Sequence, residues 1–273
     1  MKFVAPLAAV VASFALTVAA DVSGGPTWGY RSNDDSLVDT SKWAETWPAC
    51  GGARQSPINI VTKTASSKQK RKELPLEFSG KCRTFNLTEP EEPLAANRLT
   101  LCLGDCAVST NGNDFDLAQF HLHVPSEHTL NGEPLDGEIH FVHKSSDGKS
   151  LLVIGIFLVL APESNKWLDP LLDALELVNS NEYSDAVLVK LRSYSSLVKK
   201  SAKVSGIYNY PGSLTTPGCD ENVDWWVVEH PVQISSIDFG RLRQDLVESR
   251  ITNKGTNARP PQPLNGRVVT YYN

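Results

Sequence analysis

Short runs of alternating apolar and polar residues dominate this chain of 273 residues. Such runs are typical of β-strands with one buried face, and pairs such as Asn111-Gly112 and Asn131-Gly132 mark turns between them. The predicted strands cover residues 74–78, 83–88, 98–103, 115–124, 137–143, 151–160, 205–210, 224–232 and 267–271. The pattern therefore favours a β-dominated chain.

Helical periodicity is rarer. Residues 168–179 carry leucine at 168, 171, 172, 175 and 177, which predicts an amphipathic helix. Residues 181–200 form a second, weaker candidate. Ser235 precedes a third, over 237–247, and is placed to cap it. Because no linker-like stretch interrupts these elements, we expect a single mixed α+β domain on a large, mostly antiparallel sheet.

An apolar run over residues 4–20 follows Met1-Lys2-Phe3 and ends in small residues. This arrangement predicts a signal peptide, residues 1–20, cleaved before Asp21, and a secreted or lumenal domain over 21–273. A membrane anchor is the alternative, but about 17 apolar residues lie at the lower limit for a spanning helix. We therefore expect no membrane association after cleavage.

The net charge is −5 for the whole chain and becomes −6 when Lys2 is removed with the signal peptide. The densest basic cluster, 68–72, is short and is typical of a solvated loop. A mildly acidic chain without a long basic run is not expected to bind nucleic acid.

The cysteines are Cys50, Cys82, Cys102, Cys106 and Cys219. Disulfides are expected in an oxidising compartment, and an odd count leaves at least one thiol unpaired or shared between chains. An oligomer linked through that thiol is therefore possible. Asn86 begins the one Asn-x-Ser/Thr sequence, which predicts a glycan.

Five of the six histidines fall between positions 121 and 143. His121 and His123 lie two apart in a predicted strand, so their side chains should project from the same face. A third imidazole would complete a zinc cage with one open position, as in catalytic zinc sites. Metal binding explains this pair better than two separate structural histidines, each needing partners for both ring nitrogens.

The third ligand could be His128, His140 or His143. His140 is favoured because its predicted strand follows a loop rich in turn residues that can bring it back beside the first strand. His143 is three residues further on and should face the opposite side. His128 lies in the turn, where we expect it to act through hydrogen bonds.

Polar residues stand two positions before the expected ligands, so their side chains should lie on the same faces of the predicted strands. Gln119 precedes His121, and Glu138 precedes His140. Ligating imidazoles usually donate their second N–H to such groups, although an exposed polar face is the alternative. Val142 shares the face of His140, which predicts an apolar side chain beside the metal.

The spacing His-x-His followed by Glu127 also fits a cupin, with Glu127 as a fourth ligand. Phe115 stands where a cupin has glycine, and Pro134 to Gly137 departs by one residue from the second cupin motif. These departures argue against a cupin.

Gln119-Phe-His-Leu-His-x-Pro-Ser-Glu-His-Thr-x-Asn-Gly132, with Glu138-x-His-x-Val-His143, resembles the zinc-binding signature of α-class carbonic anhydrases. Four further segments resemble family motifs in the family's order: Trp28-Gly-Tyr30, Arg54-Gln-Ser-Pro-Ile-Asn-Ile60, Tyr210-Pro-Gly-Ser-Leu-Thr-Thr-Pro217 and Arg259-Pro-x-Gln-Pro-Leu264. The resemblance runs from residue 28 to about 270. It implies a twisted, largely antiparallel sheet of about ten strands with a few peripheral helices.

The resemblance also implies an activity and its residues. Zn²⁺ held by His121, His123 and His140 would support reversible hydration of carbon dioxide to bicarbonate and a proton, through attack of a zinc-bound hydroxide. Thr215 would orient that hydroxide and donate its own proton to Glu127. The remaining implied roles are outer support by Gln119, Glu138, Tyr210 and the backbone of Asn257, a bicarbonate position beside Thr216, and an apolar wall of Val142, Val153, Leu214, Val223 and Trp225.

Secreted members of the family resemble this chain in carrying cysteines where Cys50 and Cys219 stand, which implies a disulfide between them. Of the remaining cysteines, Cys82 is expected to pair with Cys102 or Cys106. The chain departs from the fast members in one respect, because no histidine precedes His121 to act as a proton shuttle. We expect proton transfer without a histidine shuttle, with a perturbed glutamate in 89–92 as the alternative.

Two other functions compete with hydration. Catalytically silent binding proteins share the fold, but they resemble this chain less because they have lost zinc ligands. A side esterase activity is also compatible with a zinc site.

Overall fold

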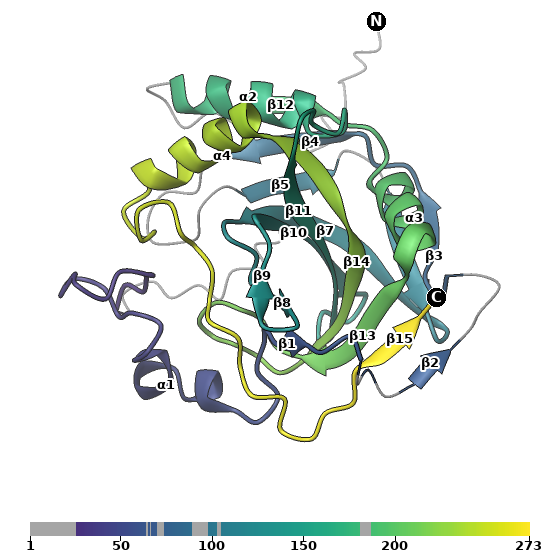
Figure 1. Cartoon of the computed structure of the whole chain (residues 1–273), viewed down its shortest axis with the longest axis horizontal. Coiled ribbons are helices and arrows are strands. Elements are labelled where there is room, and N and C mark those ends of the chain that lie inside the picture. The colour runs from purple at the N-terminus through teal and green to yellow at the C-terminus, as the bar shows by residue number, and fades with distance from the viewer. Residues whose placement is uncertain are drawn as a thin grey trace, which may run out of the picture.

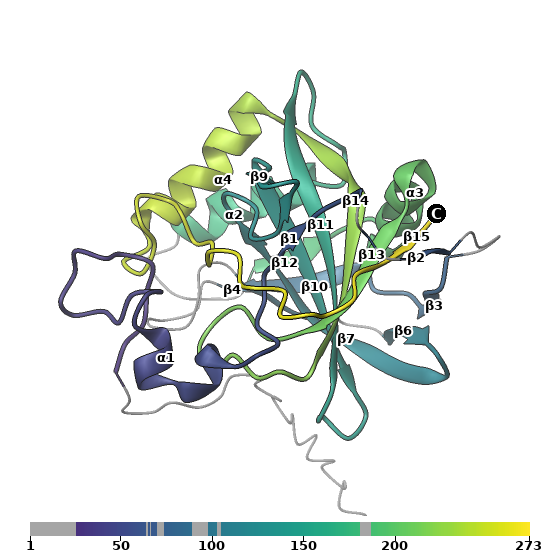
Figure 2. The same cartoon turned by 60° about the horizontal axis from the view of Figure 1, so that its bottom comes forward.

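The computed structural model describes residues 26–63, 65, 67–69, 74–88, 98–102, 105–180 and 187–273. The predicted signal peptide and the glutamates of 89–92 lie outside these ranges. Within them, one large curled sheet runs through the molecule, as Figures 1 and 2 show. The prediction of a β-dominated α+β fold is confirmed.

The large sheet contains 12 strands in the described part of the chain. Its path is β12 (Val187–Lys190), β4 (Thr84–Thr88), β5 (Arg98–Cys102), β7 (Asn113–His123), β10 (Gly137–Ser145), β11 (Leu151–Ala161), β14 (Val223–Ser235), β13 (Ile207–Gly212), β15 (Thr270–Tyr272) and β2 (Ser67–Gln69). The strands β3 (Glu77–Gly80) and β6 (Cys106–Thr110) pair with each other, and β6 also pairs with β7. The β11–β14 and β15–β2 pairs are parallel and the others antiparallel, as expected for a mostly antiparallel sheet.

A second, small sheet is formed by β1 (Asn59–Ile60), β8 (Thr129–Leu130) and β9 (Glu133–Pro134). It ties the Gln-Ser-Pro segment to the turn between β7 and β10, because Asn59 pairs with Thr129. The segment after His121 and His123 is therefore braced from an earlier part of the chain.

The two faces of the large sheet carry different cores. Phe120 and Phe141 are fully buried on the face covered by α2 (Asp169–Ser180), α3 (Tyr194–Ser205) and α4 (Ser236–Glu248). Val142 and Trp225 belong to a separate buried cluster on the opposite face. This division follows from the period of two along β10, which sends neighbouring side chains to opposite sides.

The helix predictions were partly right. The stripe over 168–179 forms α2, and Ser235 caps α4, its Oγ accepting from the backbone N of Asp238 at 3.1 Å. The prediction for 181–200 was wrong, because 187–190 form strand β12, which pairs with β4. Alternation explains this strand: Val189 is buried while Leu188 is exposed. A helix, α3, follows only after the cap at Ser193.

Most predicted strands are present with shifted ends. The strand expected over 205–210 begins at Ile207, because α3 continues through Ser205. The strand expected over 74–78 lies at Glu77–Gly80, and the C-terminal strand covers only Thr270–Tyr272. Strand β6 was missed.

The N-terminal part packs as an aromatic cluster against the disulfide that the resemblance implied. Trp28, Tyr30 and Trp43 make edge-on ring contacts beside the short helices α1 (Trp43–Thr46) and η1 (Pro48–Gly51). Cys50 of η1 is bonded to Cys219, which follows the Thr-Thr-Pro loop. The expected Cys50–Cys219 disulfide is thus formed.

A second disulfide joins Cys82 to Cys106, which resolves the choice left open by the sequence. No cysteine whose side chain is described is free. The side chain of Cys102 lies outside the described part, so an oligomer linked through this cysteine stays a prediction. Among the described helices, none has the length and apolar character needed to cross a membrane.

We expect the Cys50–Cys219 disulfide to contribute more stability than the other one, because it closes a loop of 169 residues against 24. Chain entropy gives about 4–5 kcal/mol for the long loop and about 3 kcal/mol for the short one. Replacing both cysteines of each pair by serine and measuring urea unfolding would test this order. Equal losses, or a larger loss for Cys82 and Cys106, would contradict it.

Candidate metal centre

Three imidazoles meet where β7 lies beside β10. His140 is opposite His121 in the antiparallel register, and His123 lies two residues along β7. The ring centroids are 5.0 Å apart for His121 and His123, 5.2 Å for His121 and His140, and 4.6 Å for His123 and His140. One ligand atom from each lies within 4.8 Å of the others, which fits a single metal ion.

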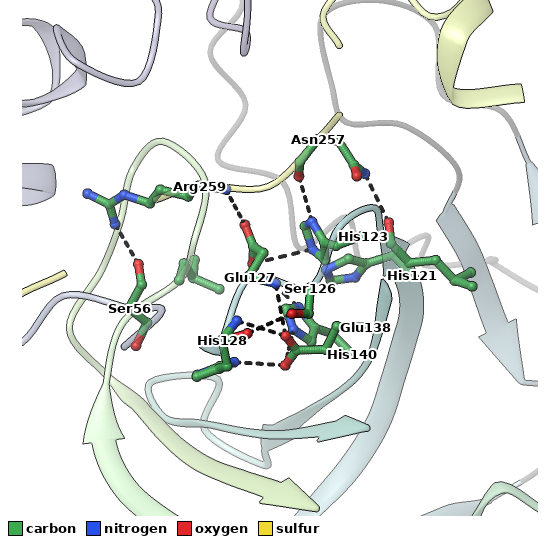
Figure 3. A network of polar contacts seen from close by, with 12 residues as sticks. Ser56, His121, His123, Ser126, Glu127, His128, Glu138, His140, Asn257 and Arg259 are labelled. Carbon is green, nitrogen blue, oxygen red and sulfur yellow. Dashed lines mark hydrogen bonds and ion pairs between the residues drawn. The ribbon is translucent and has the colours of Figure 1, made fainter. Parts of the chain in front are cut away.

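Each imidazole has an acceptor on its outer side, and Figure 3 shows Asn257 beside His123 and Glu138 beside His140. The Nδ1 atom of His121 lies 2.8 Å from Oε1 of Gln119, and that of His123 lies 2.7 Å from the carbonyl oxygen of Asn257. The Nε2 atom of His140 lies 3.0 Å from Oε1 of Glu138, which is within ion-pair distance but does not form a hydrogen bond in this structure. Acceptors in these places fix the rings, so a metal would be bound by Nε2 of His121 and His123 and by Nδ1 of His140.

The amide of Asn257 also fixes the end of β7. Its Oδ1 accepts from the backbone N of Val124 at 2.8 Å, and its Nδ2 donates to the carbonyl of Leu122 at 2.9 Å. The backbone N of Asn257 donates to the carbonyl of Val124 at 3.1 Å as well, so three hydrogen bonds between distant parts of the chain hold the residue whose carbonyl orients His123.

An unpartnered nitrogen shows that the site fits a cation. Nε2 of His123 is buried and has no hydrogen-bond partner. Burial lowers the pKa of His123, although the charge of Glu127 acts in the opposite direction. The neutral imidazole that burial favours is the form that binds a metal.

A second group, His128 with Glu138 and His140, also has ligand-like spacing. Both ring nitrogens of His128 are already engaged, at 2.7 Å from Glu138 Oε1 and 2.6 Å from the Tyr210 hydroxyl. Glu138 Oε2 accepts from the backbone N atoms of Glu127 and His128. This group is therefore a filled hydrogen-bond network, and His128 acts through hydrogen bonds as predicted.

Glu138 is the carboxylate at the centre of this network. Its complete burial raises its pKa, but the nearby His128 and His140 and their hydrogen bonds outweigh burial and hold the pKa well below the usual value. The group therefore stays ionised while it orients His140. Tyr210, expected to support the ligands, reaches His140 only through His128 and Glu138.

His143 faces the other side of the sheet, as its position predicts. Its ring nitrogens lie 3.1 Å from the carbonyl of Leu152 and 3.0 Å from the hydroxyl of Tyr194 on α3. Burial lowers its pKa to about 4. His143 is thus a buried structural histidine.

Glu127 lies at the inner side of the cage. Its Oε1 accepts from the backbone N of Arg259 at 2.9 Å, and its Oε2 lies 3.5 Å from Nε2 of His123 and 3.8 Å from Nδ1 of His140. Oε2 is buried without a hydrogen-bond partner, so the bond expected from the buried Thr215 is not formed in this structure. The pairing of Thr215 with Glu127 stays a prediction.

The apolar residues implied for the substrate wall gather in one cluster on the face of the cage. Val142, Val153 and Trp225 lie in register across β10, β11 and β14, and the Trp225 ring is 4.8 Å from that of His140. Val223 and Leu214 pack in the same cluster. Thr216 is half-buried in the loop that the Cys50–Cys219 disulfide closes.

Arg259 is a buried residue to which the sequence assigned no role. Its guanidinium donates to Gln55 Oε1, to the carbonyl of Ser56 and to the carbonyl of Cys50, and it lies over the ring of Trp43. The Gln-Ser-Pro segment and the segment that begins at Arg259 were both recognisable in the sequence, but the contact between them was not. Arg259 therefore links the disulfide region to Glu127.

Asn86, where a glycan was predicted, lies half-buried in β4 between Thr100 of β5 and Leu188 of β12. Glycosylated asparagines are usually found in surface loops, so this place in the middle of a sheet is unfavourable. Glycosylation stays a prediction.

Comparison with known proteins decides the family. The model of the eukaryotic-type carbonic anhydrase family matches residues 38–273. The chain belongs to this family. As a carbonic anhydrase it is an enzyme, a lyase, which confirms the prediction from the sequence.

Relatives match this carbonic anhydrase over most of its length. Alpha carbonic anhydrase 3 of Arabidopsis thaliana is 34% identical over 85% of this chain and 80% of its own. Carbonic anhydrase 7 of Homo sapiens is 31% identical over 91% of this chain and 98% of its own. The solved alpha-carbonic anhydrase of Thermovibrio ammonificans, in complex with the inhibitor sulfanilamide, is 28% identical with a TM-score of 0.71, covering 90% and 100%.

One structural relative has a different name. Dioscorin, solved in complex with ascorbate, has a TM-score of 0.72 at 25% identity, covering 89% of this chain and 97% of its own. The same fold therefore occurs in a protein whose recorded ligand is ascorbate.

Replacing Glu138 by Gln should weaken zinc binding by about 10–100-fold, because outer-shell partners of ligating histidines contribute on that scale. Competition with a chromogenic chelator would measure the affinity. Glu133→Gln, an exposed replacement in neighbouring β9, is the matched control and should bind zinc like the natural chain. Equal affinities in both variants would show that Glu138 does not act on the metal.

Proposed function

We propose that this carbonic anhydrase catalyses the reversible hydration of carbon dioxide to bicarbonate and a proton, with zinc bound by His121, His123 and His140. The observation that most directly supports this proposal is the convergence of three imidazoles. Their outer nitrogens face Gln119, the Asn257 carbonyl and Glu138. The cage is built from neutral ligands, so the full charge of the ion would act on a bound water. Zinc in such a site lowers the pKa of its water to about 7 and so supplies a hydroxide nucleophile near neutral pH.

The protein's own groups would orient and select the reactants. We infer that Thr215 donates its hydroxyl proton to Glu127, whose Oε2 is buried without another partner and suits an acceptor role. The backbone of Arg259 already holds the other oxygen of Glu127. This arrangement would leave the Thr215 oxygen as an acceptor toward the nucleophile, so that only a protonated oxygen is stabilised there.

The apolar wall of Val142, Val153, Leu214, Val223 and Trp225 suits an apolar, linear substrate. It offers carbon dioxide a dry surface beside the cage, and burial of that surface excludes competing water. Bicarbonate, which is charged, would find its polar contact at Thr216, on the loop that also carries Leu214.

Chelation and variants of Thr215 test the proposal together. The purified protein should contain one zinc per chain and hydrate carbon dioxide, and it should lose the activity on chelation and regain it with zinc. Thr215→Ala should lower kcat/KM by on the order of a hundredfold, the usual effect of removing one preorganised hydrogen bond. Thr215→Ser should retain most of the activity.

Activity that survives complete metal removal would overturn the zinc mechanism. A protein that holds stoichiometric zinc yet fails to hydrate carbon dioxide would instead favour a binding role. Ester hydrolysis in the same samples would show whether a side activity accompanies hydration.

We infer that the proton leaves this site without a histidine shuttle. The one histidine outside the 121–143 cluster is His230, exposed on β14, and none precedes His121 in the chain. A shuttle requires a group that titrates near the working pH, and small buffers can provide it from solution.

Turnover in dilute buffer should therefore rise when imidazole is added, because imidazole replaces the missing proton carrier. Stopped-flow hydration at fixed ionic strength would measure the rate, with a non-buffering salt as the control. A rate that does not change with imidazole would show that the chain contains an efficient carrier of its own.

We further propose that the mature enzyme is residues 21–273 and is secreted. Two disulfides support an oxidising compartment, since structural disulfides are rare in the cytosol. The apolar segment 4–20 after Lys2 supports export.

A further inference from the structure

A pocket of about 690 Å³ lies at the far edge of the large sheet from the zinc cage, between the end of α3 and the C-terminal strand β15. Figure 1 shows α3 beside β15 and the C-terminus. The lining of the pocket includes Lys199, Lys203, Ser205, Gly206, Tyr271 and Tyr272. Ligand pockets usually measure 300–1,000 Å³, so its volume suits a small organic molecule. None of these residues belongs to the metal centre.

One wall of the pocket is basic. Lys199 and Lys203 are four residues apart on α3, so they share a helix face, and both are exposed. Among the described residues neither lysine has a carboxylate partner within ion-pair distance, and the Lys199 ammonium lies 5.2 Å from the ring of Phe78. This wall of the pocket therefore carries two positive charges.

The opposite wall is aromatic and held in place. The Tyr271 hydroxyl donates to Oε2 of Glu229 at 2.7 Å, and the Tyr208 hydroxyl donates to Oε1 of the same carboxylate at 2.7 Å. The rings of Tyr208 and Tyr271 lie 4.7 Å apart. Because Glu229 accepts two hydroxyls, its charge is already engaged, and the ring of Tyr271 forms a fixed surface.

The floor requires a glycine. Gly206 has φ +98°, and a Cβ there would lie 2.5 Å from the carbonyl oxygen of Tyr272 and 2.9 Å from the Tyr271 ring. The turn after α3 can therefore pass close beneath the C-terminal strand only without a side chain. Beside it, the Oγ of Ser205 is buried without a hydrogen-bond partner.

We propose that this pocket binds a small organic anion with an aromatic ring and a carboxylate. The ring lies against Tyr271, and the carboxylate lies between Lys199 and Lys203. The aromatic wall stacks against the ring of the ligand, and the basic wall pairs with its carboxylate, so both interactions contribute to binding. The site is independent of zinc and of the hydration reaction.

Naphthoate is the probe for this proposal. Added to the isotopically labelled holoenzyme, it should shift the backbone amide signals of Ala202 and Gly206, and calorimetry should give the affinity. The variant Lys199→Glu with Lys203→Glu should bind at least about tenfold more weakly, since two exposed ion pairs contribute on that order. Lys200→Glu, on the same helix but outside the lining, is the matched control and should bind like the natural chain.

Naphthalene methanol, the neutral counterpart, and inorganic phosphate, which lacks the ring, should each bind more weakly than naphthoate. Hydration activity should be the same in all variants, which separates this site from the metal centre. The proposal is overturned if naphthoate leaves these signals unshifted, or if the variant with Lys199→Glu and Lys203→Glu binds naphthoate as tightly as Lys200→Glu does. It is also overturned if phosphate binds as tightly as naphthoate.

Discussion

The pairing of β7 with β10 is the constraint on which the metal centre depends. Its register places His140 opposite His121 and Glu138 opposite His123, so two neighbouring strands deliver all three imidazoles and one of their supports. A slip of one residue would turn His140 toward the helices and bring Phe141 into the cage. The core on the helix side prevents this slip, because Phe120 and Phe141 are fully buried there.

Buried polar groups complete what the register begins. Glu138 receives two backbone N–H groups and the ring of His128, so its position is fixed before any metal binds. Glu127 is held in the same way by the backbone of Arg259. A charged group buried without partners would be costly, so the hydrogen bonds to Glu138 and to one oxygen of Glu127 hold these two carboxylates in place. The centre is thus a set of fixed acceptors arranged around three imidazoles, and burial lowers the pKa of one of them, His123.

Local periodicity predicted much of this arrangement. The period of two along the strands identified His121 and His123 as a pair and Gln119 and Glu138 as supports, because these relations lie within single strands. The turn residues before the strand of His140 identified this histidine as their partner. Contacts between distant segments leave no such pattern. The carbonyl that orients His123 comes from Asn257, 134 residues away, and only family resemblance indicated it. The pairing of Cys82 with Cys106 and the strand at 187–190 likewise depend on neighbours that the sequence does not reveal.

Asn257 and Arg259 have a consequence for how the enzyme is made. They follow His140 by more than 100 residues, yet one orients His123 and the other fixes Glu127. During synthesis the three histidines emerge well before these supports do. The fully braced cage therefore exists only once residues 257–259 have folded back onto the end of β7. A chain cut between residues 143 and 257 would keep all three histidines and lose both supports.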